Sequence, residues 1–217
     1  MLKAILFDLD GVLVDSYQST QNYFNRTLKH FGLPEQPPEK FVPLMGKKTS
    51  DILQGLTDHQ LSPEKFEEVF AYSKQMSEEA VPEITLMANA HQVLADLAKK
   101  YTLALITNRG KKTLQLLFKQ YDLAKYFSLV IDRDDVTLHK PNPQALFMAM
   151  EKFGVGEDEA IFVGDMPEDV LAANAAGILP VLINPKVHFD NPDYLVRNLK
   201  ELQTLIQHTI DVENLIS

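Results

Sequence analysis

The sequence predicts an α/β fold, a doubly wound parallel sheet with a small helical domain inserted after the first strand. Three observations support this prediction. Short apolar runs with the length of buried strands recur along the chain, helical apolar patterns lie between them, and one long segment near the N-terminus carries only helical signals. Strands that alternate with helices form parallel sheets whose two faces are covered by helices.

The predicted strands are short apolar runs bounded by polar or turn-forming residues. They are Ala4–Phe7, Leu103–Ile106, Leu129–Ile131, Ala160–Val163 and Pro180–Ile183. The first run ends in acidic residues and a glycine, which is typical of a buried strand that passes into a loop. Because ligands of such sheets bind beyond the carboxyl ends of the strands, functional residues are expected directly after these runs.

Helices are predicted between the later strands, where apolar residues recur at helical spacing. These patterns cover Val93–Tyr101, Leu114–Tyr121 and Ala145–Phe153. A further helix should begin at Pro167 and end at Gly177, since proline suits the first turn and glycine the residue after the end. Residues Leu195–Gln207 are predicted to form a final surface helix.

The segment of residues 15–82 breaks this alternation because it has no good strand candidate. Asp15 or Ser16 can cap one helix, and Ser62 followed by proline can open another. We therefore predict an all-helical cap domain inserted into an α/β core. The predicted cap comprises residues 15–85, the core comprises residues 1–14 and 86–217, and the hinges lie near Gly11–Asp15 and Val81–Ala88.

Composition narrows the class of protein. The chain has 217 residues and a formal net charge of −9, which argues against nucleic-acid binding through a generally basic surface. It has no cysteine, so disulfides and cysteine metal sites are excluded. No apolar stretch approaches the roughly 20 residues of a membrane span, and the run Ala4–Phe7 is too short for a secretory signal. We expect a cytoplasmic protein with no nucleic-acid or membrane partner.

Polar residues follow the predicted strands at the places where ligands are expected. They are Asp8 and Asp10, Thr107 and Asn108, Lys140 before a helix, and Asp165 and Asp169. A carboxylate at a strand end can act as a nucleophile and form an aspartyl-phosphate, and Asp8 has that position. Attack on a phosphate dianion requires charge neutralisation, and Mg²⁺ prefers oxygen ligands such as the carboxylates of Asp8 and Asp165.

The remaining candidates suit supporting tasks. Lys140 and the Thr107 hydroxyl can bind phosphoryl oxygens. Asp169 can order the waters of a metal, or it can be an acid that stabilises the start of a helix. Asp10 is the candidate general acid and base, which requires a pKa raised by burial or by nearby like charges. The neighbouring Arg109 is equally compatible with a solvated charge.

These motifs, in this order and spacing, resemble the haloacid dehalogenase superfamily of phosphatases over nearly the whole chain. Asp8 and Asp10 match its Asp-x-Asp motif, Thr107 its hydroxyl motif, Lys140 its lysine motif, and Asp165 with Asp169 its acidic pair. The helical insertion resembles the cap of that family. The greatest similarity is to the branch that contains phosphoglycolate phosphatase and β-phosphoglucomutase.

The resemblance implies a Rossmann-like core with a helical cap, and a Mg²⁺-dependent phosphatase that acts on a small phosphorylated metabolite through Asp8. The implied metal residues are Asp8, Asp10, Asp165 and Asp169, and the implied phosphate-binding residues are Thr107, Asn108 and Lys140. Two departures concern hinge geometry and not catalytic groups. Met87-Ala88 stands where many relatives have Pro-Gly, and Met166-Pro167 replaces a small polar residue.

Some alternatives remain open at this level. Lys47 and Lys48 are candidate specificity residues, although a charged helix start explains them equally well. A phosphomutase uses the same motifs and must anchor a second phosphate, for which Lys47, Lys48 or Lys74 are candidates. A dehalogenase needs no acid at the position of Asp10, and a phosphonate hydrolase of the same superfamily lacks that residue, so Asp10 argues against both. A non-catalytic binding protein is expected to have lost at least one motif residue, whereas this chain has all of them. Monomer and homodimer are both compatible with the sequence.

Overall fold

The computed structural model describes residues 1–185 and 194–216. Its main sheet has six strands in the order β5-β4-β1-β6-β7-β8, and all neighbouring strands are parallel. The strands are β1 (Ala4–Phe7), β4 (Thr102–Ile106), β5 (Leu129–Ile131), β6 (Ala160–Gly164), β7 (Leu179–Ile183) and β8 (Leu195–Val196). Strand β1 lies between β4 and β6, so the loops that follow these three strands meet at one edge of the sheet.

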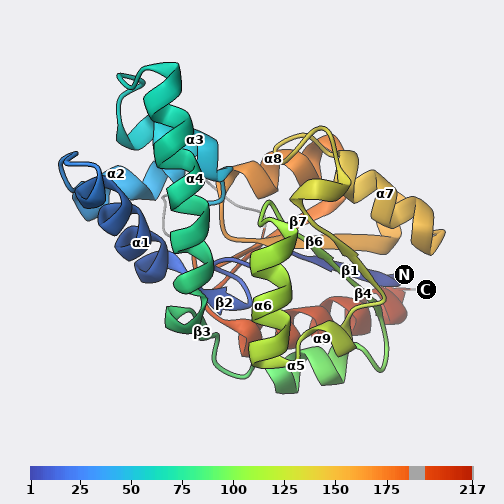
Figure 1. The fold of residues 1–217 in the computed structure, drawn as a ribbon. Helices are drawn as coiled ribbons and strands as arrows, with labels where there is room; N and C mark the ends of the chain where they lie inside the picture. The colour runs from blue at the N-terminus through green and yellow to red at the C-terminus, as the bar shows by residue number, and fades with distance from the viewer. Residues whose placement is uncertain (186–193, 217) are drawn as a thin grey trace.

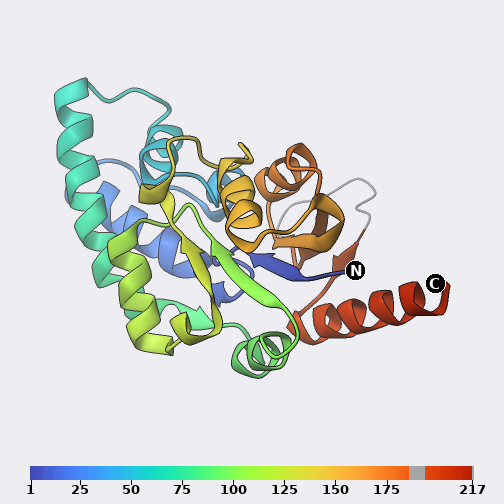
Figure 2. The ribbon, with the colours of Figure 1, turned by 90° about the vertical axis from the view of Figure 1, so that its right-hand side faces the viewer.

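Helices cover both faces of this sheet (Figures 1 and 2). On one face lie α5 (Ala90–Leu97), α6 (Lys111–Tyr121) and α9 (Leu199–Ile216); on the other lie α7 (Gln144–Phe153) and α8 (Pro167–Ala175). Alternate residues of β1 supply the two cores, since Ile5 and Phe7 pack with the first group while Ala4 and Leu6 pack with the second. The predicted doubly wound α/β core is confirmed.

The C-terminal part differs from the predicted helix over Leu195–Gln207. Leu195 and Val196 form β8 instead, and the Asn184 amide donates to the Val196 carbonyl at 2.9 Å. Helix α9 begins at Leu199, where the Asn198 side chain accepts a hydrogen bond from the Glu201 amide at 3.0 Å. A two-residue strand has no periodicity that distinguishes it from the first turn of a helix.

The inserted segment forms a separate layer of helices beside the sheet (Figure 1). Its helices are α1 (Tyr17–His30), α2 (Pro38–Phe41), α3 (Thr49–Leu56) and α4 (Pro63–Glu79). They enclose an apolar cluster of their own, with Phe24, Phe41 and Leu53 fully buried. The Ser62 hydroxyl caps α4 by accepting a hydrogen bond from the Lys65 amide, as the sequence predicted.

A short antiparallel ribbon connects the helical layer to the core. It consists of β2 (Val14–Asp15) and β3 (Thr85–Leu86), and the Met87 amide donates to the Leu13 carbonyl at 2.9 Å. The predicted domain borders fall within this ribbon, whose strands are too short to have a sequence pattern. Short 3₁₀ helices complete the chain at Val42–Leu44, Val81–Glu83, Ala124–Tyr126, Arg133–Asp135 and Glu157–Glu159. In the described part of the chain, no helix is both long and apolar enough to cross a membrane.

Candidate active site

The loops after β1, β4 and β6 bring Asp8, Thr107 and Asp165 together at the carboxyl edge of the sheet. All three side chains are buried. The sheet hydrogen bonds continue into two of them, since the Asp8 amide donates to the Val163 carbonyl at 2.8 Å and the Thr107 amide to the Ile131 carbonyl at 3.0 Å. The neighbouring strands therefore set the backbone positions of Asp8 and Thr107.

Lys140 is buried at the centre of this group. Its Nζ lies 2.9 Å from Oδ1 of Asp8 and 2.7 Å from Oδ1 of Asp169. Burial lowers the pKa of Lys140, but the carboxylates of Asp169 and Asp8 outweigh it and raise that pKa above its usual value. A buried ammonium is tolerated only when it is paired in this way, so Lys140 carries a fixed positive charge next to Asp8.

Asp169 uses both oxygens of its carboxylate. Oδ1 contacts Lys140, and Oδ2 accepts hydrogen bonds from the amides of Asp165 and Met166, both at 3.1 Å. The residue lies in the first turn of α8, where the helix dipole favours an acid. In this structure Asp169 therefore holds the lysine and the loop after β6 in place.

Three carboxylates gather beside this lysine in a form that suits a metal ion. One oxygen each of Asp8, Asp165 and Asp169 lies within 4.8 Å of the others. Oδ1 of Asp165 is buried, and it has no hydrogen-bond partner in the described part of the chain. A divalent cation with a preference for oxygen, such as Mg²⁺, fits this set of donors and would neutralise their charge.

The backbone at Gly11 makes room for these carboxylates. Gly11 has a φ of +79°, and a Cβ at this position would lie 1.9 Å from Oδ2 of Asp165.

The carboxylates of the cluster have raised pKa values. Burial raises the pKa of Asp8 to about 7; the Lys140 charge lowers this pKa, and the nearby Asp169 and Asp10 raise it further. Burial, with Asp169 and Asp8, also raises the pKa of Asp165 well above its usual value.

Asp10 is bound by Arg109, which differs from the expectation for a proton donor. Nε of Arg109 donates to Oδ2 of Asp10 at 3.0 Å, and a terminal guanidinium nitrogen pairs with Oδ1. Burial raises the pKa of Asp10, but the Arg109 charge and hydrogen bonds from Arg109 and Ser16 lower it below its usual value. The predicted raised pKa is thus wrong for this state, because the guanidinium outweighs burial.

A cavity of about 370 Å³ lies over the site, between the sheet edge and the helical layer. The core lines it with Asp8, Asp10, Thr107 and Asn108, and the inserted segment lines it with residues of α3, α4 and the loop before α3. Nδ2 of Asn108 donates to the Gly46 carbonyl at 2.9 Å and so connects the two sides. The Thr107 hydroxyl oxygen accepts from the Arg109 amide at 3.1 Å, which leaves its proton for another acceptor.

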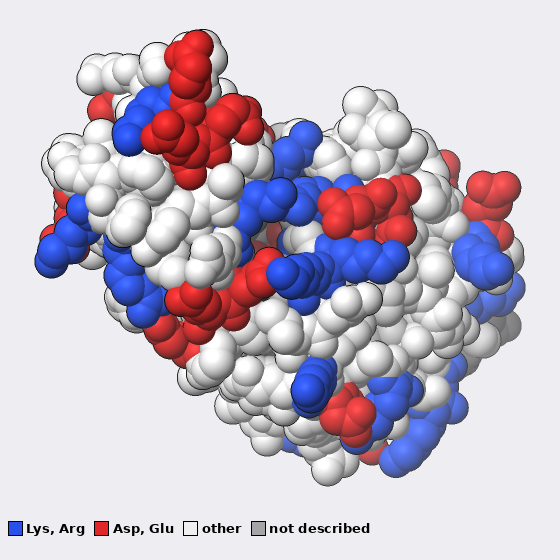
Figure 3. Space-filling model, viewed as in Figure 1, with Lys and Arg blue, Asp and Glu red and all other residues white. Residues whose placement is uncertain are grey.

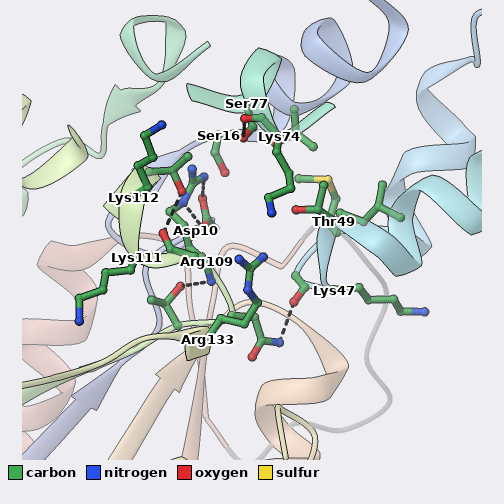
Figure 4. A pocket seen from close by; sticks show the side chains of 18 of the residues that line it. Asp10, Ser16, Lys47, Thr49, Lys74, Ser77, Arg109, Lys111, Lys112 and Arg133 are labelled. Atoms are coloured by element: carbon green, nitrogen blue, oxygen red, sulfur yellow. Dashed lines mark hydrogen bonds and ion pairs between the residues drawn. The ribbon is translucent and has the colours of Figure 1, made fainter. Parts of the chain in front are cut away.

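The candidate specificity residues of the cap have different positions. Lys47 lines the cavity, but its side chain points away from Asp10 and Arg109 (Figure 4). Lys48 is the N-cap of α3 and is not among the residues that line the cavity. Sequence reasoning did not assign Arg109 or Arg133 to the site, although both line it. The available signal was weak: Arg109 directly follows Thr107 and Asn108, and a basic residue there is unusual in so acidic a chain.

Comparison with known proteins agrees with this geometry. Residues 5–183 match the model of the family described as haloacid dehalogenase-like hydrolase. A phosphoglycolate phosphatase from Yersinia pseudotuberculosis is 31% identical, over 81% of this chain and 78% of its own. A pyrophosphatase PpaX from Bacillus velezensis is 30% identical, over 80% of this chain and 79% of its own.

The same fold occurs in solved structures. The crystal structure of a predicted phosphoglycolate phosphatase from Haemophilus somnus superposes with a TM-score of 0.87 at 24% identity, and the match covers 94% of this chain and 98% of that one. At that identity the likeness concerns the fold alone. The family model covers most of the sequence and all of the motif residues, so the chain belongs to the haloacid dehalogenase-like hydrolase family.

Proposed function

We propose that this protein is a Mg²⁺-dependent phosphatase that hydrolyses a small phosphorylated metabolite through an aspartyl-phosphate on Asp8. One observation carries the proposal: the Asp8 carboxylate is buried beside a paired lysine, next to two further carboxylates, and it lines the cavity between the core and the helical layer. The relatives named phosphoglycolate phosphatase and pyrophosphatase support a small phosphate compound as substrate.

Asp8 attacks phosphorus in the first step, and the surrounding side chains prepare it for that role. Lys140 holds Oδ1 of Asp8 at 2.9 Å and thereby orients the other oxygen. The Lys140 charge and the Thr107 hydroxyl stabilise the phosphoryl oxygens as negative charge develops on them. A Mg²⁺ ion held by Asp8 and Asp165 would offset the repulsion between the carboxylate and the phosphate.

Asp10 donates a proton to the leaving oxygen, and it then accepts one from the water that hydrolyses the aspartyl-phosphate. The Arg109 guanidinium favours the carboxylate form of Asp10, so Asp10 has to leave this ion pair before it donates. The proposal therefore includes a rearrangement of Arg109 when substrate enters the cavity.

The nucleophile is tested with Asp8→Asn and a generic aryl phosphate in the presence of Mg²⁺. We expect the rate to fall by about 1,000-fold or more, because an amide cannot form the phospho-enzyme. Asp122→Asn is the matched control, since Asp122 is an exposed residue at the end of α6 that pairs with the exposed Lys125 and does not line the cavity. Retained hydrolysis in Asp8→Asn would remove Asp8 as the nucleophile.

Product analysis separates a phosphatase from a phosphomutase. A sugar phosphate supplied with catalytic amounts of its bisphosphate should give inorganic phosphate and free sugar. Formation of an isomeric sugar phosphate without net phosphate release would replace the proposed hydrolysis by phosphoryl transfer within the substrate.

A further inference from the structure

Positive charge is concentrated around the mouth of the cavity, although the chain has a formal net charge of −9. Lysine and arginine side chains surround the hollow between the helical layer and the core (Figure 3). Those that line the cavity are Lys47, Lys74, Arg109, Lys111, Lys112 and Arg133. The buried Lys140 already serves the reacting phosphoryl group, so these cations exceed what one phosphate requires.

Several of these cations are committed elsewhere. Lys112 pairs with Glu78 at 2.6 Å, and Arg109 pairs with Asp10. The side chains of Lys47 and Lys111 extend away from the middle of the cavity in Figure 4. These four residues therefore do not account for the positive charge inside the cavity.

Lys74 and Arg133 remain, and both point into the cavity from opposite sides (Figure 4). Lys74 belongs to α4 in the cap, and its Nζ lies 5.4 Å from the centroid of the Phe70 ring. Arg133 follows β5 in the core, and its Nε forms a long ion pair with Oδ1 of the adjacent Asp134 at 3.4 Å. Its terminal nitrogens are not part of that pair, and they point into the cavity (Figure 4). Among the described residues, Lys74 has no acidic partner in an ion pair.

The position of Arg133 is fixed by the main chain beneath it. A Cβ at Gly110 would lie 2.4 Å from a terminal nitrogen of Arg133, so the glycine allows the guanidinium to rest on the backbone at this point. Two like charges that point into one cavity from separate elements repel each other, and an anion between them would offset that repulsion. Their arrangement therefore favours the binding of an anion in the cavity.

We propose that Lys74 and Arg133 form a second anion subsite, and that the substrate carries a carboxylate or second phosphoryl group besides the one attacked by Asp8. This inference rests on the proposed phosphatase function and specifies its substrate class. The cavity of about 370 Å³ suits a small substrate that carries two anionic groups. Because the subsite has one member in the cap and one in the core, the second anion also links the two when it binds.

Matched pairs of esters test the subsite. Phosphoglycolate and 2-hydroxyethyl phosphate differ by a carboxylate in place of a hydroxymethyl group. Ethane-1,2-diol bisphosphate and 2-hydroxyethyl phosphate form a second pair, which differs by a second phosphoryl group on the distal oxygen. In the wild type we expect kcat/KM to be at least about 10-fold higher for the charged member of at least one pair. The preferred pair distinguishes a carboxylate from a phosphoryl group as the second anion.

Lys74→Gln and Arg133→Gln should each reduce this ratio several-fold towards one, mainly through KM. Lys119→Gln is the control, because Lys119 is an exposed lysine of α6 that does not line the cavity. A ratio near one in the wild type, or a ratio that is the same in all four proteins, would overturn the subsite and leave the phosphatase function intact.

Binding measurements keep the test independent of turnover. Phosphonoacetate and 2-hydroxyethylphosphonate have no ester bond to hydrolyse, and they differ by a carboxylate in place of a hydroxymethyl group, as the first ester pair does. Calorimetry with Mg²⁺ therefore reports the subsite even in a protein that hydrolyses no ester. Tighter binding of phosphonoacetate that is lost in both glutamine variants supports the subsite. Equal binding of the two compounds by the wild type overturns it.

Discussion

The ion pair between Arg109 and Asp10 is the residue-scale feature with the clearest kinetic consequence. The guanidinium favours the ionised form of Asp10, so the free enzyme holds the catalytic proton only at lower pH. Arg109→Met removes this charge and should raise the pKa of Asp10. The expected result is that the alkaline limb of the kcat/KM profile moves to higher pH, because that profile reports the free enzyme.

The control for this prediction is Arg109→Lys, which keeps the positive charge but loses the two-point contact. Its profile should lie between those of the wild type and Arg109→Met. If Arg109→Met and the wild type have superimposable profiles, then Arg109 does not govern the proton on Asp10.

The carboxylate cluster makes a second residue-scale prediction, which concerns stability without metal. The pKa of Asp8 is about 7 in the folded protein and 3.8 in the unfolded reference, and that of Asp165 is also raised. A raised pKa means that these two groups bind more protons in the folded state, so the stability that they contribute is greatest at low pH and falls as pH rises from about 4 to about 7. Mg²⁺ should restore stability at the upper end of this range.

Asp165→Asn separates the pH-dependent stability that the carboxylate cluster contributes from that of the other titrating groups. In EDTA, its melting temperature should exceed that of the wild type by several degrees at pH 8 and by little at pH 4, because the amide removes one repelling charge. Mg²⁺ should shift the variant less than it shifts the wild type. A variant that is less stable than the wild type at pH 8 without metal would contradict this account of the cluster.

At the scale of elements, the turn after β1 places Gly11 against Asp165. Gly11→Ala introduces both an unfavourable φ and a Cβ 1.9 Å from Oδ2 of Asp165. Gly154→Ala is a matched control, because Gly154 has a φ of +63° and a Cβ there would meet nothing within 4 Å. We expect the control to lose about 1 kcal/mol in urea unfolding, from backbone strain alone.

Gly11→Ala should lose clearly more stability than this control, and it should also reduce the stabilisation by Mg²⁺, since Asp165 has to move. Equal losses in the two variants would mean that the turn can relax without disturbing the metal residues.

The elements that could be predicted from the sequence are those whose burial requires a recognisable run or period of apolar residues. The central strands β1, β4 and β6 are buried almost throughout, so their apolar runs are unambiguous, and the rule for parallel sheets then placed Asp8, Thr107 and Asp165 together. The strands β2, β3 and β8 have two residues each, which is too few for a period to appear. Arg109 was missed as the partner of Asp10 because their pairing depends on side-chain directions across 99 positions of sequence.

At the scale of the whole molecule, the cap and the core meet at the ribbon of β2 and β3, where Val81 and Ile84 also pack into the core, and through polar contacts near the cavity. Asn108 of the core bonds to the Gly46 carbonyl, and Lys112 of α6 pairs with Glu78 of α4 at 2.6 Å. The Lys112 side chain is 75% exposed, so this pair contributes about 1 kcal/mol or less. A domain contact of this strength can open for substrate entry and close again, as the predicted hinges require.

Charge reversal at this contact tests whether it holds the cap closed. Lys112→Glu places a negative charge beside Glu78, and the repulsion should increase the radius of gyration of the free protein in solution scattering at low salt. Because salt screens exposed charges, the difference should disappear near 1 M salt. The double variant Lys112→Glu with Glu78→Lys restores an attractive pair and should recover the wild-type profile. If the single variant scatters like the wild type at low salt, the ion pair has no part in closure, and the other contacts between the cap and the core set the position of the cap.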